Sequence, residues 1–171
     1  YGKSFRDIVR GFRGDFSAAP DAVAFPRSEA EVVAVLAWCA DARVAAIPYG
    51  GGSSVCGGVE ARLSGAYEGA VSIDLSRLDR IVEINPEDMY ITVEAGVTWK
   101  AIYEALAPRG LRLPFFGTFS GARATVGGGL SNGALFLGTA RYGTAADCML
   151  GLEVVLADGT LLRTGQAAFR N

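Results

Sequence analysis

The chain has 171 residues and a formal net charge of −2, with 50% hydrophobic and 20% charged residues. This composition favours a folded core, and the well-mixed charges give no basic footprint for nucleic acid. The sequence contains no histidine, which excludes a Ser-His-Asp triad, a histidine general base and most zinc sites. Its 3 cysteines are scattered, a pattern typical of a reducing compartment, and no apolar run is long enough for a transmembrane segment.

Residues 1–20 predict a short N-terminal docking segment. Four apolar side chains stand at helical spacing, namely Phe5, Ile8, Val9 and Phe12. Residues 21–26 then predict a strand that ends at a proline.

Residues 22–47 predict a strand, a helix and a second strand, which together are compatible with a small parallel βαβ unit. Ser28 and Glu31 form a capping-box pattern at the start of the helix. We expect Val32, Val35, Leu36 and Cys39 on its buried face, with Trp38 on that face or at its edge.

A glycine-rich stretch follows the second strand directly. Residues 48–58 read Pro-Tyr-Gly-Gly-Gly-Ser-Ser-Val-Cys-Gly-Gly. Glycine allows close approach of a ligand to the backbone, and successive free N–H groups form an anion site. The stretch leaves the carboxyl end of a predicted strand, where open α/β sheets bind ligands. We therefore predict a phosphate or pyrophosphate loop, with a flexible surface loop as the alternative.

The middle of the chain predicts mostly strands. Residues 70–75 alternate apolar and polar side chains, and residues 80–85 and 89–95 predict a hairpin. Thr98 caps a helix whose apolar face we expect in the core, formed by Trp99, Ile102, Tyr103 and Leu106. Towards the end, residues 149–163 predict a hairpin that turns at Asp158-Gly159.

A second stretch of small and hydroxyl residues covers positions 118–133. Residues 126–132 predict a short helix whose first N–H groups attract an anion. Residues 138–143 predict a loop that carries Arg141 and Tyr142. Neither glycine cluster fits the P-loop or the Rossmann fingerprint. One long ligand with a diphosphate and a ring system, such as FAD, fits two such segments better than ATP or NAD.

Five segments, in chain order, resemble the FAD-binding domain of the vanillyl-alcohol oxidase/p-cresol methylhydroxylase (PCMH) superfamily. They are residues 24–32, 48–58, 74–78, 93–97, and 124–128 together with 141–143. The sequence is similar to the FAD-linked oxidase branch, which contains D-lactate and glycolate dehydrogenases and is related to alkyldihydroxyacetonephosphate synthase.

The resemblance implies an α+β fold, namely a two-lobed PCMH-type FAD-binding domain. The first lobe would contain the small parallel βαβ unit, and the second a mixed or antiparallel sheet with helices. After the docking segment 1–20, the lobes would cover residues 21–84 and 85–171. Relatives continue into a substrate-binding cap domain that carries the catalytic base. We therefore expect that C-terminal domain, and any catalytic residue, to be absent from this chain.

The resemblance also implies the cofactor-binding residues. The backbone of Gly50, Gly51, Gly52, Ser53 and Ser54 would hold the pyrophosphate, and Pro48 and Val55 would line the same groove. The path toward the flavin would be lined by Thr118, Ser120, Ala124, Thr125, Gly127, Gly128, Ser131 and Asn132. The expected hydroxyl donor to the isoalloxazine edge is Thr125, with Ser120 as the alternative. Arg141 or Arg123 would face the anionic edge of the flavin, or lie in solvent.

Relatives with covalent flavin often carry a histidine near the position of Ser53. Its absence implies non-covalent FAD, and we expect Cys56 to be a small buried residue instead of an attachment point. The implied function is oxidation of a 2-hydroxy acid, of the D-lactate or glycolate type, by hydride transfer to FAD. The alternatives are an alkyldihydroxyacetonephosphate synthase-like transferase and a non-catalytic flavin-binding fragment. We expect a small-molecule substrate, an electron acceptor that the residues do not identify, no metal, and a cytoplasmic location or a peripheral one at a membrane.

Overall fold

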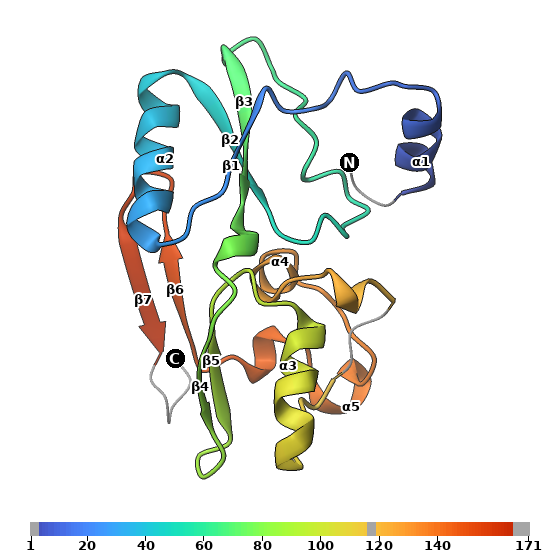
Figure 1. The fold of residues 1–171 in the computed structure, drawn as a ribbon, viewed down its shortest axis with the longest axis vertical. Coiled ribbons are helices and arrows are strands. Elements are labelled where there is room, and N and C mark those ends of the chain that lie inside the picture. The colour runs from blue at the N-terminus through green and yellow to red at the C-terminus, as the bar shows by residue number, and fades with distance from the viewer. Residues whose placement is uncertain (1–3, 116–118, 166–171) are drawn as a thin grey trace.

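The computed structural model describes residues 4–115 and 119–165. A three-stranded parallel sheet with strand order β1-β3-β2 occupies one end of the molecule, the upper half of Figure 1. Its strands are β1 (Ala22–Ala24), β2 (Val44–Tyr49) and β3 (Gly69–Asp74). Both outer strands pair with β3 in parallel. The predicted parallel arrangement is confirmed, although β3 lies between the two strands of the βαβ unit.

The central strand β3 is buried on both faces. Its consecutive residues Ala70, Val71, Ser72 and Ile73 are all buried. The predicted strand is confirmed, and Ser72 is buried along with its apolar neighbours because the central strand of this small sheet is covered from both sides. The edge strand β2, in contrast, accommodates Pro48, whose missing N–H can face the unpaired side.

Helix α2 (Glu29–Asp41) covers one face of this sheet (Figure 1). The Ser28 hydroxyl accepts a hydrogen bond from the Glu31 N–H at 3.3 Å, as predicted. The Glu31 carboxylate accepts from the Arg27 N–H at 2.7 Å, so the reciprocal half of the capping box is displaced by one residue. Cys39 is buried in the core, whereas Trp38 is 53% exposed and lies at the edge.

The other end of the molecule is built on an antiparallel hairpin and a helix. Strands β4 (Ile81–Asn85) and β5 (Tyr90–Val93) form the predicted hairpin, and α3 (Trp99–Leu106) packs beside it with its cap at Thr98. A second core lies here, separate from that of the parallel sheet. Its buried members are Val97, Trp99, Ile102, Leu106, Phe115 and Ala145. The predicted apolar face of this helix is therefore confirmed.

The chain closes with two short helices and a second hairpin. These are α4 (Val126–Ser131), α5 (Thr139–Tyr142), β6 (Gly151–Val155) and β7 (Leu161–Gly165). The hairpin is confirmed, with Gly159 at φ +82° in its turn. The predicted loop at 138–143 instead contains the single turn of α5. Short 3-10 turns lie at Leu75–Arg77, Ala107–Arg109, Phe119–Ala122 and Ala146–Cys148.

Helix α1 (Phe5–Phe12) lies apart from α2, on the far side of the sheet in Figure 1. Glu60, whose side chain is 4% exposed, holds it by accepting hydrogen bonds from Arg6 and Arg10 at 3.3 and 3.0 Å. Phe5 and Phe12 are 81% and 90% exposed. The predicted helix is confirmed, and it docks through its charged face while its phenylalanines face outward.

Two kinds of feature are absent from the part of the chain that the structure describes. None of its helices has the length and apolar character needed to cross a membrane. Likewise, residues 4–115 and 119–165 hold no group of three or more acidic, cysteine or histidine side chains placed to bind a metal ion.

Candidate cofactor site

The loop after β2 presents a run of main-chain N–H groups. Between Gly50 and Ser54, none of the successive N–H groups donates a hydrogen bond within the described residues. Within this loop, Gly52 is buried and adopts φ +59°. Buried N–H groups are almost always paired in folded proteins, and successive free N–H groups in a turn form an anion-binding concavity. The loop therefore has the donors that a phosphate group requires.

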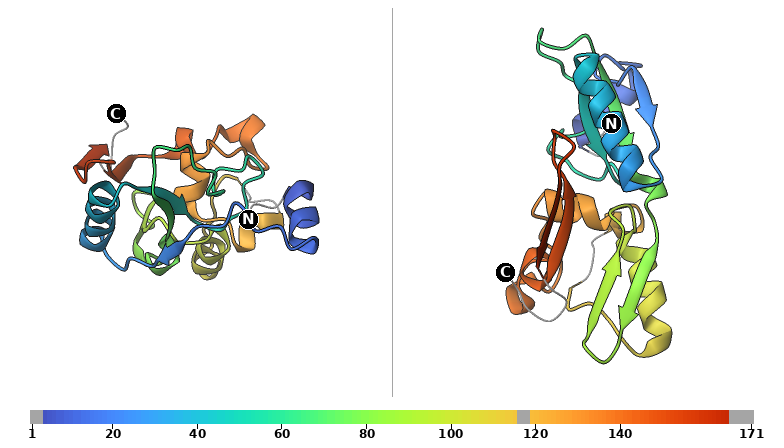
Figure 2. Two further views of the ribbon diagram at one scale, coloured as in Figure 1. Left: turned by 90° about the horizontal axis from the view of Figure 1, so that it is seen from above. Right: turned by 90° about the vertical axis from the view of Figure 1, so that its left-hand side faces the viewer.

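The second glycine-rich segment packs directly against this loop. A Cβ atom added to Gly50 would collide with the Thr125 hydroxyl, and one added to Gly51 with the Arg123 carbonyl oxygen. Figures 1 and 2 show the same approach, with the chain after β2 running down to α4. Glycine is needed at both positions for space, because the Thr125 side chain lies where a side chain of Gly50 would stand, and backbone atoms of residues 123–124 lie where one of Gly51 would stand. The two segments that the sequence singled out thus form one continuous site.

The N-terminus of α4 does not offer free donors to an anion. Its first four N–H groups are all engaged within the protein. Those of Val126, Gly127, Gly128 and Gly129 donate, in that order, to Val97 O, Ala95 O, Thr125 Oγ1 and Thr125 O at 2.8, 2.9, 3.3 and 2.9 Å. The expectation that this helix start attracts an anion is therefore wrong, because a neighbouring segment and the cap residue use these groups.

Thr125 links the two segments. Its side chain is only 4% exposed, its hydroxyl caps α4, and the same oxygen lies against Gly50. A hydroxyl that accepts one hydrogen bond still has its own proton to donate. The geometry therefore places Thr125 at the junction of the site, and its role as a donor to the flavin stays a prediction. Ser120, the alternative donor, is half-buried in the turn before it.

The remaining predicted residues differ in their surroundings. Thr118 lies outside the described residues. Pro48, Val55, Ser131 and Asn132 are exposed, whereas Ser53, Ser54, Ala124, Gly127 and Gly128 are half-buried. The Asn132 amide donates to the Gly128 carbonyl at 2.9 Å and so caps the end of α4. The Ser54 hydroxyl accepts from the Cys56 N–H at 3.2 Å, which stabilises the outer part of the loop.

Cys56 does not occupy the position expected of it, and the two arginines differ in their surroundings. Cys56 is exposed, so the prediction of a buried thiol is wrong. The chain runs along the surface there, as the 66% exposure of Val55 shows. The Arg141 guanidinium lies over the ring of Tyr142, 5.2 Å from its centroid. Arg123 is exposed, and its carbonyl is the group that faces the loop.

The sequence reading missed two contributors to the site. Gly96 lies beneath α4, where an added Cβ would meet the Leu75 carbonyl, and its N–H donates to the Leu78 oxygen at 2.8 Å. Tyr49 is the second, because its ring lies against Gly52. The local signals for them are weak: a glycine between two predicted elements for Gly96, and an aromatic residue immediately before a glycine run for Tyr49.

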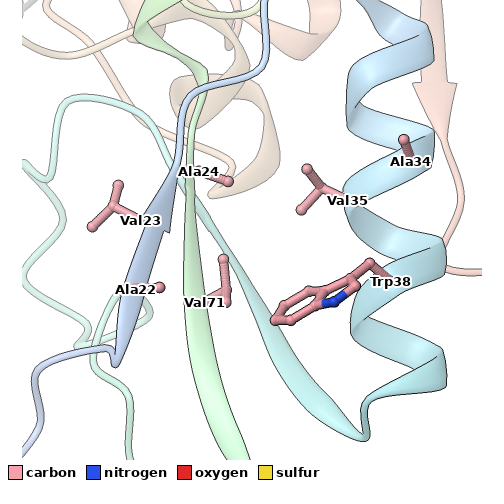
Figure 3. Close-up of a pocket in the computed structure, with 7 residues that line it drawn as sticks. All are labelled: Ala22, Val23, Ala24, Ala34, Val35, Trp38 and Val71. Atoms are coloured by element: carbon pink, nitrogen blue, oxygen red, sulfur yellow. The ribbon is translucent and has the colours of Figure 1, made fainter.

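An apolar hollow of about 320 Å³ lies away from this site, between α2 and the strands β1 and β3 (Figure 3). Alanine and valine side chains line it together with the ring of Trp38. Apart from the indole N–H of Trp38, the side chains of these walls provide no donors for a phosphate group. The glycine loop, and not this hollow, is the candidate site.

Comparison with known proteins decides the family. The model of a family described as "FAD binding domain" matches residues 20–165. The chain belongs to this family. It is 41% identical over 145 residues to a probable mitochondrial D-lactate dehydrogenase of Danio rerio, covering 85% of this chain and 28% of that protein. It is 33% identical over 150 residues to the glycolate oxidase subunit GlcD of Bacillus subtilis, covering 88% and 31%.

A solved structure gives the same result for the fold. The structure of an alkyldihydroxyacetonephosphate synthase superposes with a TM-score of 0.84 at 26% identity, covering 97% of this chain and 29% of that one. The mixed α/β architecture, with parallel and antiparallel sheets, is therefore that of an FAD-binding fold. The chain spans less than a third of the length of each of these three proteins.

The residues of the site fit FAD. A diphosphate needs several donors close together, and the loop from Gly50 to Ser54 has a row of N–H groups that the described residues leave unpaired. A cofactor with a diphosphate and a ring system also needs groups from more than one segment, and this loop lies directly against residues 123–125. FAD is the cofactor of this domain.

Proposed function

We propose that this chain binds and orients FAD in a flavin-dependent oxidoreductase that oxidises a 2-hydroxy acid. The observation that carries the proposal is the row of unpaired N–H groups from Gly50 to Ser54, packed against residues 123–125. The names of two relatives, a D-lactate dehydrogenase and a glycolate oxidase subunit, indicate the substrate class. When bound, FAD accepts the hydride equivalent that is removed from the substrate.

Within this function, the described residues have three tasks. The main-chain N–H groups of the first loop hold the diphosphate, as hydrogen bonds to a charged group contribute about 1.5–3 kcal/mol each. The segment 120–128 lines the path to the flavin ring, with Thr125 as its hydroxyl donor. None of these residues is assigned to proton abstraction, so the catalytic base belongs to another part of the enzyme.

The proposed FAD is bound without a covalent bond. The sequence holds no histidine, the residue expected near Ser53 in covalent relatives. The test is acid precipitation of the yellow protein followed by spectroscopy of both fractions. Free FAD in the supernatant is the expected result. A flavin that stays with the precipitate would contradict it, and would point to the exposed thiol of Cys56 as the attachment point.

The two-lobed organisation is also a proposal. It is supported by the two separate cores and by the change from the parallel sheet to antiparallel hairpins. A boundary at residue 84 would cut β4, which pairs with β5, so we place it in the turn at residues 75–80. Limited proteolysis with and without FAD tests this division, with the first cleavages expected in that turn once the cofactor is removed.

FAD binding is tested by titration of the purified protein with FAD, FMN and riboflavin, using flavin fluorescence. Riboflavin should bind at least about a hundredfold more weakly than FAD, because it lacks the charged oxygens that the loop's N–H groups would hold. Equal affinity for riboflavin and FAD would show that this loop does not bind the diphosphate. No change in fluorescence with any of the three would end the flavin proposal for this chain.

Oxidation of a 2-hydroxy acid is tested by anaerobic addition of substrate to the FAD-loaded full-length enzyme. D-lactate or glycolate should bleach the visible absorbance of the flavin. The alternative function is an alkyldihydroxyacetonephosphate synthase-like exchange, which the structural match favours. A flavin that stays oxidised with both acids, together with exchange of an acyl group for an alcohol, would establish that alternative. Binding without either reaction would indicate a flavin-binding module.

The compartment remains a prediction. A cytoplasmic or membrane-peripheral location fits the scattered cysteines and the lack of a spanning helix in the described residues. The D-lactate dehydrogenase relative is named mitochondrial, and fractionation of cells that produce the full-length protein distinguishes these locations.

A further inference from the structure

Strand β2 ends in an aromatic residue that turns back over the glycine loop. Tyr49 is the last residue of β2 and is half-buried. The three atoms nearest to a Cβ added at Gly52 all belong to the Tyr49 ring: its hydroxyl oxygen, its Cζ at 2.7 Å and its Cε2 at 2.9 Å. The phenol ring therefore occupies the space in which a side chain of Gly52 would stand.

Gly52 has a backbone conformation that residues with a side chain rarely adopt. It has φ +59°, a left-handed conformation that glycine adopts without steric cost. The same freedom lets a run of glycines visit many other conformations, and fixing one residue costs about 1–2 kcal/mol. A ring that packs against one side of Gly52 restricts those alternatives before any ligand arrives.

The Tyr49 ring is not anchored by a hydrogen bond within the described part of the chain. Within the described residues, the Tyr49 hydroxyl has no hydrogen-bond partner. If a hydrogen bond of the hydroxyl held the ring, loss of that oxygen would release the ring. Here the contact with Gly52 is made by the far edge of the ring, Cζ and Cε2, together with the oxygen.

We propose that Tyr49 is a positioning residue for the diphosphate loop: its ring holds the backbone at Gly52 in the shape that leaves the N–H groups of residues 50–54 available to the diphosphate. This inference rests on the proposed binding of the FAD diphosphate at this loop. It goes beyond that proposal because it gives a side chain the task of shaping a site whose binding groups belong to the backbone. In this role the Tyr49 ring acts through its bulk, and its hydroxyl group is not required.

The test compares FAD affinity in the variants Tyr49→Ala and Tyr49→Phe of the full-length protein. Tyr49→Ala should weaken FAD binding about tenfold, because the loop must then be ordered on binding. Tyr49→Phe keeps the ring and should bind FAD within about twofold of the parent. Riboflavin affinity should not change in either variant, because riboflavin has no diphosphate. A general structural defect would lower the affinity for riboflavin as well as for FAD. If Tyr49→Ala does not fold, Tyr49→Leu carries the same test, because its side chain is too short to reach Gly52.

Tyr67→Ala is the matched control. Tyr67 is 49% exposed on the excursion between β2 and β3, so this variant also removes a partly exposed tyrosine ring and should leave FAD affinity unchanged. Parent-like affinity in Tyr49→Ala would overturn the positioning role. Equal losses in Tyr49→Phe and Tyr49→Ala would overturn it in favour of a direct contact of the hydroxyl with the diphosphate. If the parent protein binds no FAD, the proposed function itself is refuted, whatever the variants do.

Discussion

Gly51→Ala is the most direct perturbation of the contact between the two glycine-rich segments. An added Cβ at Gly51 would meet the carbonyl group of Arg123 and the main-chain nitrogen of Ala124. These are backbone atoms, so they cannot swing away as a side chain can. Gly51 is not in the left-handed region, and backbone strain therefore plays no part. Overpacking of this kind typically costs about 1–3 kcal/mol.

At about 2–4 °C per kcal/mol for a chain of this size, the melting temperature of Gly51→Ala should fall by about 2–12 °C. The same displacement opens the site, so FAD affinity should fall at least about tenfold. Gly58→Ala is the matched control, since it lies in the same loop with no atom within 4 Å of its added Cβ and no positive φ. Thermal melting and flavin titration of both variants provide the measurements. Parent-like stability and affinity in Gly51→Ala would refute the packing of the loop on residues 123–124.

Three further predictions follow from single contacts. Thr125→Val should lower stability by about 1 kcal/mol through loss of the helix cap, while Thr125→Ser should not, as chemical denaturation can show. The pKa of Glu29 is raised by hydrogen bonding to Glu153, so its ionisation opposes folding; Glu29→Gln should raise the melting temperature at neutral pH and not below the ordinary pKa of 4.5. The Arg80 guanidinium lowers the pKa of Glu94, so the ionised carboxylate stabilises the fold. This stabilisation is complete above pH 4.5 and is lost on further acidification. Glu94→Gln should therefore make the melting temperature fall less steeply as the pH is lowered below 4.5.

The sequence predicted the elements whose signals are local. Helix α3 begins at the predicted cap Thr98 and buries the predicted Trp99. The hairpin β6–β7 turns at the predicted Asp158-Gly159, where a left-handed residue is required. The glycine loop could also be recognised, since a glycine run after a buried strand has few structural explanations. In each case, neighbouring residues along the chain determine the conformation.

Features that depend on distant contacts were not predictable in the same way. The sequence pattern of α4 matches an anion-binding helix start, but residues 95–97 take up its first N–H groups. Helix α1 has an apolar stripe, yet it docks through Glu60, which lies 50 residues beyond Arg10. Cys56 resembles a small core residue by its type, and its exposure depends on the path of the loop. None of these partners is marked in the local sequence.

The glycines of the site serve two different physical purposes, and the distinction explains how backbone alone can position a cofactor. Gly52 is needed for its left-handed conformation, which glycine adopts without steric cost. Gly51, Gly96 and Gly127 have no positive φ and are needed for space, because each lies against the backbone of another segment. These contacts connect the turn after β3 to residues 95–97, then to α4, and then to the loop. The position of the loop that we propose as the diphosphate site is therefore determined by close contacts that link it to α4, to residues 95–97 and to the turn after β3.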